Sequence, residues 1–335
     1  MLSPPSQIPN QITETLLQAD NLLIVSHVFP DGDALGSQLA LGEILESLGK
    51  KVYYYCEESV STMYEFMPGS EKLKNDLPDI AVFDATVAVD CGDRFRLGQE
   101  VDNLLQIHPF IVIDHHAGHK DFGDISWVEA DRSSTAEMIF DLALALNAEI
   151  SYNAAYCLYT AIVSDSGSFK YESTSAYTFH VASHLLNLGV IPSEVAGKLF
   201  DNYSVNRLRM LEKVLGSLEL HADGQIAIIS ATNDMFEATG AKREDTEEFI
   251  NLPRALSSVK VAAFFKETLD GYIKVSLRAK GECDVSQVAL KCGGGGHRNA
   301  AGYRVQDKLL AEVSAELLQE LNRRLKPGWP ADEER

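Results

Sequence analysis

The chain has 335 residues, of which 45% are hydrophobic, and this length and composition favour two folded domains over a disordered chain. Its 29 Lys and Arg residues stand against 49 Asp and Glu residues, and the formal net charge of -20 disfavours a protein that coats long nucleic acid through many phosphate contacts. Its 5 cysteines have no close-pair spacing, so they indicate neither a disulfide framework nor a zinc finger and fit a reducing compartment.

The N-terminal stretch MLSPPSQIPNQITETLLQADN lacks the basic segment and the apolar core of a secretory signal. The sequence contains no run of about 18 uncharged apolar residues, so a transmembrane helix is not expected. We therefore expect a cytoplasmic protein without a membrane partner. A short anionic substrate, held locally, remains compatible with the acidic composition.

Short apolar runs alternate with longer amphipathic ones between residues 20 and 150. NLLIVSH, KVYYYC, ATVAVD and PFIVID are typical of strands, whereas ALGSQLALGEILESLG is typical of a helix. In SSTAEMIFDLALALN, the spacing of Ser134 and Glu137 matches a capping box and marks a helix start. This order predicts an α/β fold whose N-terminal domain has a mainly parallel sheet flanked by helices.

The rest of the chain predicts a helical connection and a second, smaller sheet. Residues 153–216 are expected to be mainly helical, and RLRMLEKVLGSLEL is a candidate connector. Beyond it, GQIAIIS, VKVAAFFKE and GYIKVSLRA alternate like strands, and KLLAEVSAELLQELNRRL supplies a closing helix. We predict domains at 1–195 and 217–335, joined by a helical linker at 196–216, with a mixed sheet in the smaller C-terminal α/β domain.

Four clusters of acidic residues and histidines follow apolar segments of the chain. Their members are His27, Asp31 and Asp33 in SHVFPDGDALGS, Asp90 in VAVDCGD, Asp114, His115 and His116 in IVIDHH, and Asp165 in YTAIVSDSGSF. In an open parallel sheet, ligands bind beyond the carboxyl ends of the strands, so three of these clusters should converge there. The segment before Asp165 is expected to be helical.

Each cluster also has a purely structural interpretation. The first suits a solvated turn, because Asp, Gly and Pro are turn residues. Asp90 could cap a helix, His115 could be a hydrogen-bonded core histidine, and Asp165 could pair with a lysine. Turns alone do not explain why the pattern recurs at successive strand ends.

Together the clusters offer many carboxylate oxygens, some imidazoles and no obvious thiolate ligand. Such a set suits Mn²⁺, with Mg²⁺ as the alternative, better than structural zinc, and it has enough ligands for two ions. Two divalent ions about 3.5–4 Å apart can activate a bridging water and clamp phosphoryl oxygens during in-line displacement. The sequence therefore predicts phosphoester hydrolysis.

A glycine run and one arginine are candidate substrate-binding elements. In GGGGHRNAAG at 293–302, glycines let backbone N–H groups approach an anion, and the following histidine and arginine could contact a terminal phosphate or a base. A flexible turn is the alternative, although a turn rarely needs four glycines in a row. The candidates are Gly294, Gly295, Gly296, His297, Arg298 and, in RFRLG, Arg96, for which a surface salt bridge is the alternative.

The motifs SHVFPDGDALGS, VAVDCGD, VIDHH and SDSGSF resemble, in this order, the four motifs of the DHH phosphoesterases. GGGGHRNAAG resembles the signature of their C-terminal DHHA1 domain, so the resemblance spans nearly the whole chain. It implies a DHH catalytic domain at 1–195 and a DHHA1 substrate-binding domain at 217–335. One departure is Ser166, where relatives commonly have Thr, and a hydroxyl is kept either way.

The resemblance also implies a role for each residue of the motifs. One metal ion would be held by His27, Asp31 and Asp90, and the other by Asp33, Asp90, His115 and Asp165, which makes Asp90 the bridge. Asp114 would orient the histidine, and His116 would face the scissile phosphate or the bridging water. Asp114 and His116 are therefore the candidate catalytic residues.

The function implied by the resemblance is hydrolysis of short oligoribonucleotides to mononucleotides, with a phosphatase activity on 3′-phosphoadenosine 5′-phosphate. The expected partners are short RNA or small nucleotides and not long nucleic acid, and a homodimer is left open. A linear or cyclic dinucleotide phosphodiesterase is one alternative. A nucleotide-sensing module without turnover is another, although the complete ligand set argues against it.

Overall fold

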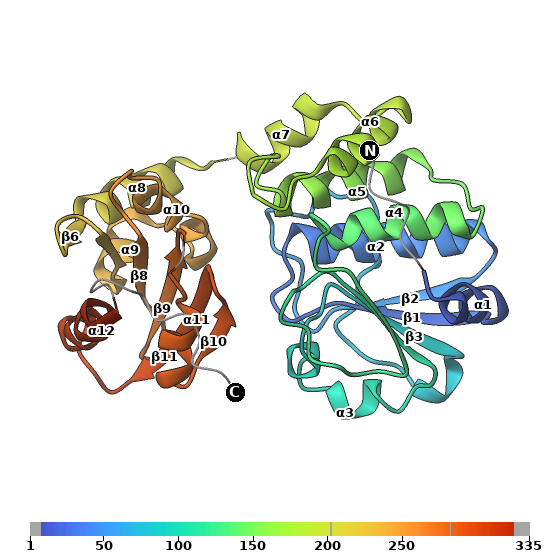
Figure 1. Cartoon of the computed structure of the whole chain (residues 1–335), viewed down its shortest axis with the longest axis horizontal. Helices are drawn as coiled ribbons and strands as arrows, with labels where there is room; N and C mark the ends of the chain where they lie inside the picture. Colours follow the sequence, from blue (N-terminus) through green and yellow to red (C-terminus); the bar gives the residue numbers. More distant parts are fainter. Residues whose placement is uncertain (1–7, 202, 282, 325–335) are drawn as a thin grey trace. The chain divides into compact units, whose positions relative to one another are not determined.

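The chain divides into two compact units, the first ending at residue 202 and the second beginning at Tyr203 (Figure 1). The structure is a computed structural model that describes residues 8–201, 203–281 and 283–324, and only the backbone of His297. No helix in these ranges is long and apolar enough to cross a membrane.

The first unit is built on a sheet of five parallel strands in the order β2-β1-β3-β4-β5. The strands are β1 (Asn21–Val25), β2 (Lys51–Tyr55), β3 (Ala85–Val89), β4 (Phe110–Asp114) and β5 (Ile125–Val128). The helices are α1 (Asn10–Gln18), α2 (Gly32–Ser47), α3 (Val101–Leu104), α4 (Thr135–Ala145), α5 (Tyr152–Asp165), α6 (Ala176–Asn187) and α7 (Pro192–Phe200). Short 3₁₀ turns occur at Ser70–Lys72, Ile80–Val82 and Arg94–Leu97.

Both faces of this sheet are buried, which explains why its strands are continuously apolar. In β1, Leu22 and Ile24 belong to the larger core on the α2, α4 and α5 side, and Leu23 and Val25 to a smaller core on the α3 side. Figure 1 shows α2, α4 and α5 on one side of the sheet and α3 on the other. The strand ends are thereby held between two packed layers.

Helices α2 and α5 approach each other closely because α2 carries glycine at the contact. A Cβ atom on Gly36 would lie 2.6 Å from the carbonyl oxygen of Cys157 and 2.8 Å from the Cβ atom of Ala161. A Cβ atom on Gly32 would lie 2.5 Å from Ser164 Oγ. Only glycine permits this separation, which brings the first turn of α2 next to the last turn of α5.

The second unit contains a mixed sheet of six strands in the order β10-β11-β9-β8-β7-β6, in which only β7 and β8 are parallel. The strands are β6 (Glu219–His221), β7 (Ile226–Ala231), β8 (Val261–Glu267), β9 (Tyr272–Ala279), β10 (Gly295–His297) and β11 (Ala300–Gln306). The helices are α8 (Val205–Gly216), α9 (Asn233–Thr239), α10 (Asn251–Arg254), α11 (Ser286–Lys291) and α12 (Leu310–Arg324), with a 3₁₀ turn at Arg243–Thr246.

This sheet also separates two cores. Val261 and Phe265 of β8 pack with residues of α11 and α12, whereas Phe264 packs on the opposite face with residues of α8 and α9. Met210 and Val214 of α8 are fully buried in that second core. Residues 196–216, predicted as a helical linker, are thus divided between the end of α7 and a helix that packs in the second unit.

The predicted fold class, a parallel α/β unit followed by a smaller unit with a mixed sheet, is confirmed. The predicted capping box is wrong in its detail. Helix α4 begins at Thr135 as expected, but the Ser134 side chain makes no capping hydrogen bond. The hydroxyl of Ser133 donates to Glu137 at 2.6 Å instead. The helix start is completed by an aspartate from another part of the chain.

Candidate metal centre

The predicted residues of the first unit gather at the carboxyl ends of β1, β3 and β4. His27 follows β1 by two residues, Asp90 follows β3 directly, and Asp114 ends β4 just before His115. The chain leaves β1 toward β2 on one side, whereas β3 lies on the other side of β1. This is a topological switch point, where open parallel sheets bind ligands.

Two aspartates reach this point from the start of α2. Asp31 is the N-cap residue, and its Oδ1 accepts from the backbone N–H groups of Asp33 and Ala34, both at 3.1 Å. Asp33 lies in the first turn and is 0% exposed. Its Oδ2 accepts from the Thr135 N–H at 2.7 Å, and its Oδ1 from the Ala136 N–H at 3.1 Å.

Asp90 lies at the centre of the cluster in a constrained backbone conformation. Its φ of 56° is in the left-handed region, which non-glycine residues seldom adopt. The side chain is buried, and its Oδ1 accepts from the Thr135 hydroxyl at 3.0 Å. Its Oδ2 lies 3.7 Å from His27 Nε2.

His115 Nε2 lies among three carboxylates. The distances are 3.6 Å to Asp33 Oδ2, 3.5 Å to Asp90 Oδ1 and 3.3 Å to Asp165 Oδ2. Asp165 reaches this position as the last residue of α5. Three groups have ligand atoms within 4.8 Å of one another: His27 with Asp31 and Asp90; Asp33 with His115 and Asp165; and Asp90 with His115 and His116.

The ring of His115 is oriented by a backbone carbonyl. Its Nδ1 lies 3.1 Å from the Arg132 carbonyl oxygen, a contact that requires the proton on Nδ1. Burial lowers the pKa of His115, but Asp90, Asp165 and Asp33 outweigh it and raise the pKa to about 9, so without a cation Nε2 carries a proton toward the carboxylates near pH 7. A metal ion bound through Nε2 would take the place of this proton. Arg132 is held in turn by ion pairs of its guanidinium with Glu129 at 2.8 Å and Asp141 at 3.1 Å.

The contacts of His27 admit only one of two tautomers at a time. Its Nδ1 lies 2.9 Å from the Val28 carbonyl oxygen and also 2.9 Å from Arg96 Nη2. Nδ1 can donate to the carbonyl or accept from the guanidinium, but cannot do both. Metal binding through Nε2 requires the tautomer in which Nδ1 carries the proton and donates to the Val28 carbonyl oxygen. Burial is the largest influence on the pKa of His27 and lowers it, so the ring is neutral near pH 7, the form that binds metals.

Asp114 binds two imidazoles, neither of which is that of His115. Its Oδ1 lies 2.6 Å from His116 Nδ1, and its Oδ2 lies 2.6 Å from His119 Nδ1. Burial alone would raise the pKa of Asp114, but the hydrogen bonds from His116 and His119 lower it to about 2. The ionised carboxylate therefore fixes both rings with their protons on Nδ1.

The electrostatics of the cluster match a cation-binding site. Burial, the largest influence, raises the pKa values of Asp33, Asp90 and Asp165, and the neighbouring carboxylates raise them further. No lysine or arginine forms an ion pair with any of these three carboxylates among the described residues. Carboxylates and a neutral imidazole are the donors that Mn²⁺ and Mg²⁺ use, and cations there would relieve the repulsion.

The glycine run is a hairpin of the second unit, and its glycines have structural reasons. A Cβ atom on Gly294 would lie 2.1 Å from the Gly302 carbonyl oxygen, and one on Gly296 would lie 2.5 Å from that of Ala300. Gly295 has open space around its Cα atom. Arg298 is exposed in the turn between β10 and β11, and the side chain of His297 lies outside what the structure describes.

Several residues of this region were not predicted from the sequence. They are His119, Arg132, Thr135 and Ser37, whose hydroxyl donates to Asp33 at 3.0 Å. A third histidine in DHHAGH could have drawn attention to His119. Arg132 acts through its backbone, which the sequence does not reveal.

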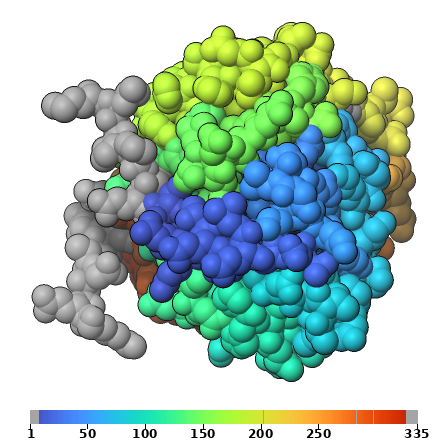
Figure 2. Space-filling view, turned by 90° about the vertical axis from the view of Figure 1, so that its right-hand side faces the viewer, coloured from blue at the N-terminus to red at the C-terminus, as the bar shows by residue number. Residues whose placement is uncertain are grey.

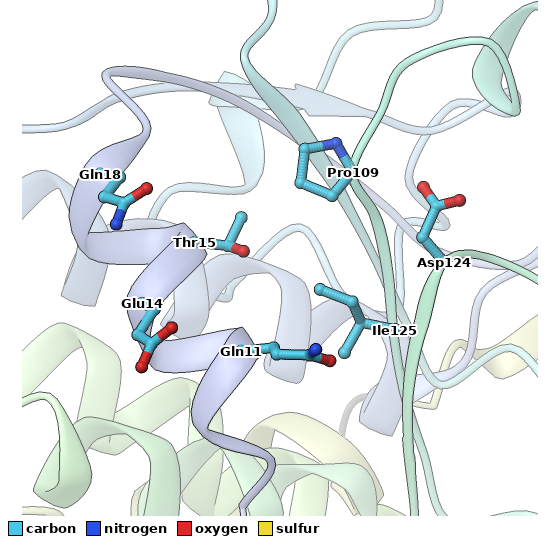
Figure 3. A pocket seen from close by; sticks show the side chains of 7 residues that line it. All are labelled: Gln11, Glu14, Thr15, Gln18, Pro109, Asp124 and Ile125. Carbon is cyan, nitrogen blue, oxygen red and sulfur yellow. The ribbon is translucent and has the colours of Figure 1, made fainter.

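The pocket drawn in Figure 3 lies at the opposite edge of the first sheet. Gln11 and Thr15 of α1 face Pro109 and Ile125, which stand at the amino ends of β4 and β5 (Figure 3). In Figure 2, the surface of α1 belongs to the dark blue region that faces the viewer. None of the predicted site residues lines the pocket.

Comparison with known proteins gives the same assignment as the motifs. Residues 21–162 match the N-terminal domain of the DHH family, and residues 225–326 match the DHHA1 domain. The bifunctional oligoribonuclease and PAP phosphatase NrnA of Thermus thermophilus is 30% identical over 305 residues, 91% of this chain and 90% of that protein. The probable NrnA of Streptococcus mutans is 33% identical over 313 residues, 92% and 96% of the two chains.

A solved structure agrees with these relatives. The exopolyphosphatase-related protein from Bacteroides fragilis has 30% sequence identity and a TM-score of 0.89, over 95% of this chain and 96% of that one. The fold is thus that of a two-domain DHH protein. The chain belongs to the DHH/DHHA1 family, and relatives named NrnA match it over nearly their whole length.

Proposed function

We propose that this protein is a divalent-metal-dependent phosphodiesterase that hydrolyses short oligoribonucleotides to mononucleotides and acts as a phosphatase on 3′-phosphoadenosine 5′-phosphate. The observation that carries the proposal is the convergence of His27, Asp90, His115 and their neighbouring aspartates at the switch point. The names of the NrnA relatives, oligoribonuclease and PAP phosphatase, supply the substrate classes.

The ligand sets that we propose follow the two groups that share no residue. His27, Asp31 and Asp90 would hold one ion, and Asp33, His115 and Asp165 would hold the other, with Asp90 contributing to both because its Oδ1 lies 3.5 Å from His115 Nε2. Mn²⁺, or Mg²⁺ in its place, would supply Lewis-acid polarisation of phosphoryl oxygens and activation of a water.

The chain's own residues orient the reacting groups. The carbonyl of Arg132 and the carboxylate of Asp114 fix the tautomers of His115 and His116, so both rings keep a proton on Nδ1. In our proposal His116 presents Nε2 to the scissile phosphate or the attacking water, because the Asp114 carboxylate holds the ring through its Nδ1 proton. Arg96, which contacts His27, would place a positive charge beside the substrate phosphate.

A substrate panel tests the proposal. A trimer RNA, 3′-phosphoadenosine 5′-phosphate, linear and cyclic dinucleotides and pyrophosphate are each incubated with the protein and Mn²⁺ or Mg²⁺, and the products are separated. We expect mononucleotides from the trimer and adenosine monophosphate from the bisphosphate, both abolished by chelator. Preferred turnover of cyclic dinucleotides would favour the alternative phosphodiesterase, and tight binding of all substrates without products would favour a sensor.

A further inference from the structure

Three cationic side chains stand in register across neighbouring strands of the second sheet. Lys266 of β8 pairs with Lys274 of β9, and Lys274 pairs with Arg304 of β11. Directly paired residues of antiparallel strands point to the same face, with Cβ atoms about 4.5–5.5 Å apart. Lys266, Lys274 and Arg304 therefore form a row across one face of the sheet, here named the cationic row.

The cationic row runs from a partly exposed end at Lys266 to an exposed end at Lys274 and Arg304. Phe264, two residues before Lys266 and on the same face, is buried in the core with residues of α8 and α9. The Lys266 ammonium donates to two uncharged acceptors, the Arg243 carbonyl oxygen at 3.4 Å and the Thr246 hydroxyl at 3.2 Å. Lys274 and Arg304 are exposed.

The charge of the row is not balanced by ion pairs. Among the described residues, no carboxylate lies within 4.0 Å of the charged nitrogen atoms of Lys266, Lys274 or Arg304. Glu247 is the carboxylate whose charge acts on both lysines, whereas Arg243 adds to the positive charge around Lys266. Like charges in directly paired positions destabilise a sheet, so an anion bound to the row would remove a cost that the fold otherwise carries.

The same face of the sheet continues into the glycine hairpin. Gly302 pairs with Ser276 and with Gly295, so these residues share the face of Lys274. Arg278 of β9 pairs with Ala300 of the hairpin. It lies four residues after Lys274, so the strand covers about 13 Å between Lys274 and this part of the hairpin. This span exceeds the separation of the two phosphates in a nucleoside bisphosphate, whereas a chain of several nucleotides can follow it.

We propose that the cationic row of Lys266, Lys274 and Arg304 binds a backbone phosphate of an oligoribonucleotide other than the phosphate that is hydrolysed. This assignment rests on the proposed function and adds to it a determinant of substrate length. An oligonucleotide that brings a second phosphate to the row gains charge-assisted contacts in addition to those of the hydrolysed phosphate.

Variants at the two exposed positions test the inference in the full chain. We compare Lys274→Gln and Arg304→Gln with Lys308→Gln, a matched control whose ammonium pairs with Glu316 of α12, on the opposite face of the sheet. The KM for a five-nucleotide RNA should rise roughly tenfold in Lys274→Gln and Arg304→Gln, with a smaller effect on 3′-phosphoadenosine 5′-phosphate. Lys308→Gln should match the unaltered protein.

The affinity for RNA, measured in the presence of a chelator, supplies a second test of the inference. The affinity for a fluorescent five-nucleotide RNA is measured at several salt concentrations, and each row variant should reduce the slope of log K against log salt by about 1. If the unaltered protein hydrolyses RNA but the row variants behave like Lys308→Gln in both assays, the inference is wrong and the proposed function stands. If the unaltered protein hydrolyses no RNA at all, the proposed function fails first.

Discussion

Asp33 accepts a hydrogen bond from the backbone N–H of Thr135 at 2.7 Å, although 102 residues separate the two in the chain. The same carboxylate accepts from the N–H of Ala136 at 3.1 Å. It thereby satisfies the first turn of α4, which the neighbouring Ser134 does not. A candidate metal ligand is therefore also the cap of a helix from another part of the chain.

Asp33 therefore has a structural role that Asp165 lacks, because Asp165 accepts no hydrogen bond from the residues that the structure describes. Asp33→Ala should lower the free energy of unfolding by about 1–2 kcal/mol, because the two N–H groups lose their acceptor. Asp165→Asn should leave this free energy unchanged or higher, because burial and neighbouring carboxylates disfavour its charged form.

Urea denaturation in the presence of a chelator measures the free energy of unfolding of both variants without the contribution of bound metal. Each should also lose turnover on the trimer RNA. Equal destabilisation by the two substitutions would contradict the capping role of Asp33.

Asp90 occurs in two of the three ligand groups, whereas Asp31 occurs in one. Asp90→Ala should therefore remove more bound Mn²⁺ than Asp31→Ala, as measured by elemental analysis after dialysis. Its activity loss should exceed the roughly 10–100-fold typical of residues that only orient metal ligands. If both variants retain the same metal content, Asp90 is not shared between the two ions.

The fold could be predicted because hydrophobic runs determine strands that are buried on both faces. Leu22 to Val25 alternate between two cores, so all four had to be apolar, and the run was visible in the sequence. The strands β10 and β11 could not be predicted in this way. Glycine has low strand propensity, and Gly294 and Gly296 are explained only by the backbone that approaches them.

The candidate site could be predicted as a set of residues but not as a set of contacts. The strand ends indicated where His27, Asp90 and His115 would meet, because parallel strands end at one edge of a sheet. Which group orients His115 depended on the backbone carbonyl of Arg132, and every residue has such a carbonyl. The partners of Asp114 also emerged only from the structure, because the sequence does not show which of the three nearby histidines its carboxylate binds.

Gly36→Ala tests the close approach of α2 and α5. The added methyl group would lie 2.6 Å from the carbonyl oxygen of Cys157, so the helices must separate. We expect a loss of about 1–3 kcal/mol in unfolding free energy. We also expect weaker Mn²⁺ binding, because the two helices carry Asp33 and Asp165.

Gly197→Ala is the matched control, because Gly197 lies within α7 and has no atom near its missing Cβ. Alanine should be neutral there or stabilising by up to about 1 kcal/mol. Metal binding by Gly36→Ala at unaltered affinity would show that the spacing of these helices does not set the site.

The pH dependence of RNA binding should report on Lys266. Burial, as the largest influence, and the neighbouring charge of Lys274 lower its pKa to about 8; Glu247 opposes and Arg243 adds to this effect. The ammonium therefore loses its proton as the pH rises through about 8. The affinity for the five-nucleotide RNA in chelator should fall between roughly pH 7 and 9, since its internal phosphates stay charged throughout.

The titration of Lys266 does not destabilise the folded protein over this range. Between a pH of about 8 and the ordinary lysine pKa of 10.5, the unfolded chain binds a proton at Lys266 that the folded chain does not. This group therefore adds stability as the pH rises through that window, while RNA binding weakens. Lys266→Gln should bind RNA weakly at pH 7 and show little further loss up to pH 9. An unaltered protein whose affinity stays constant across this range would exclude Lys266 from the phosphate contact.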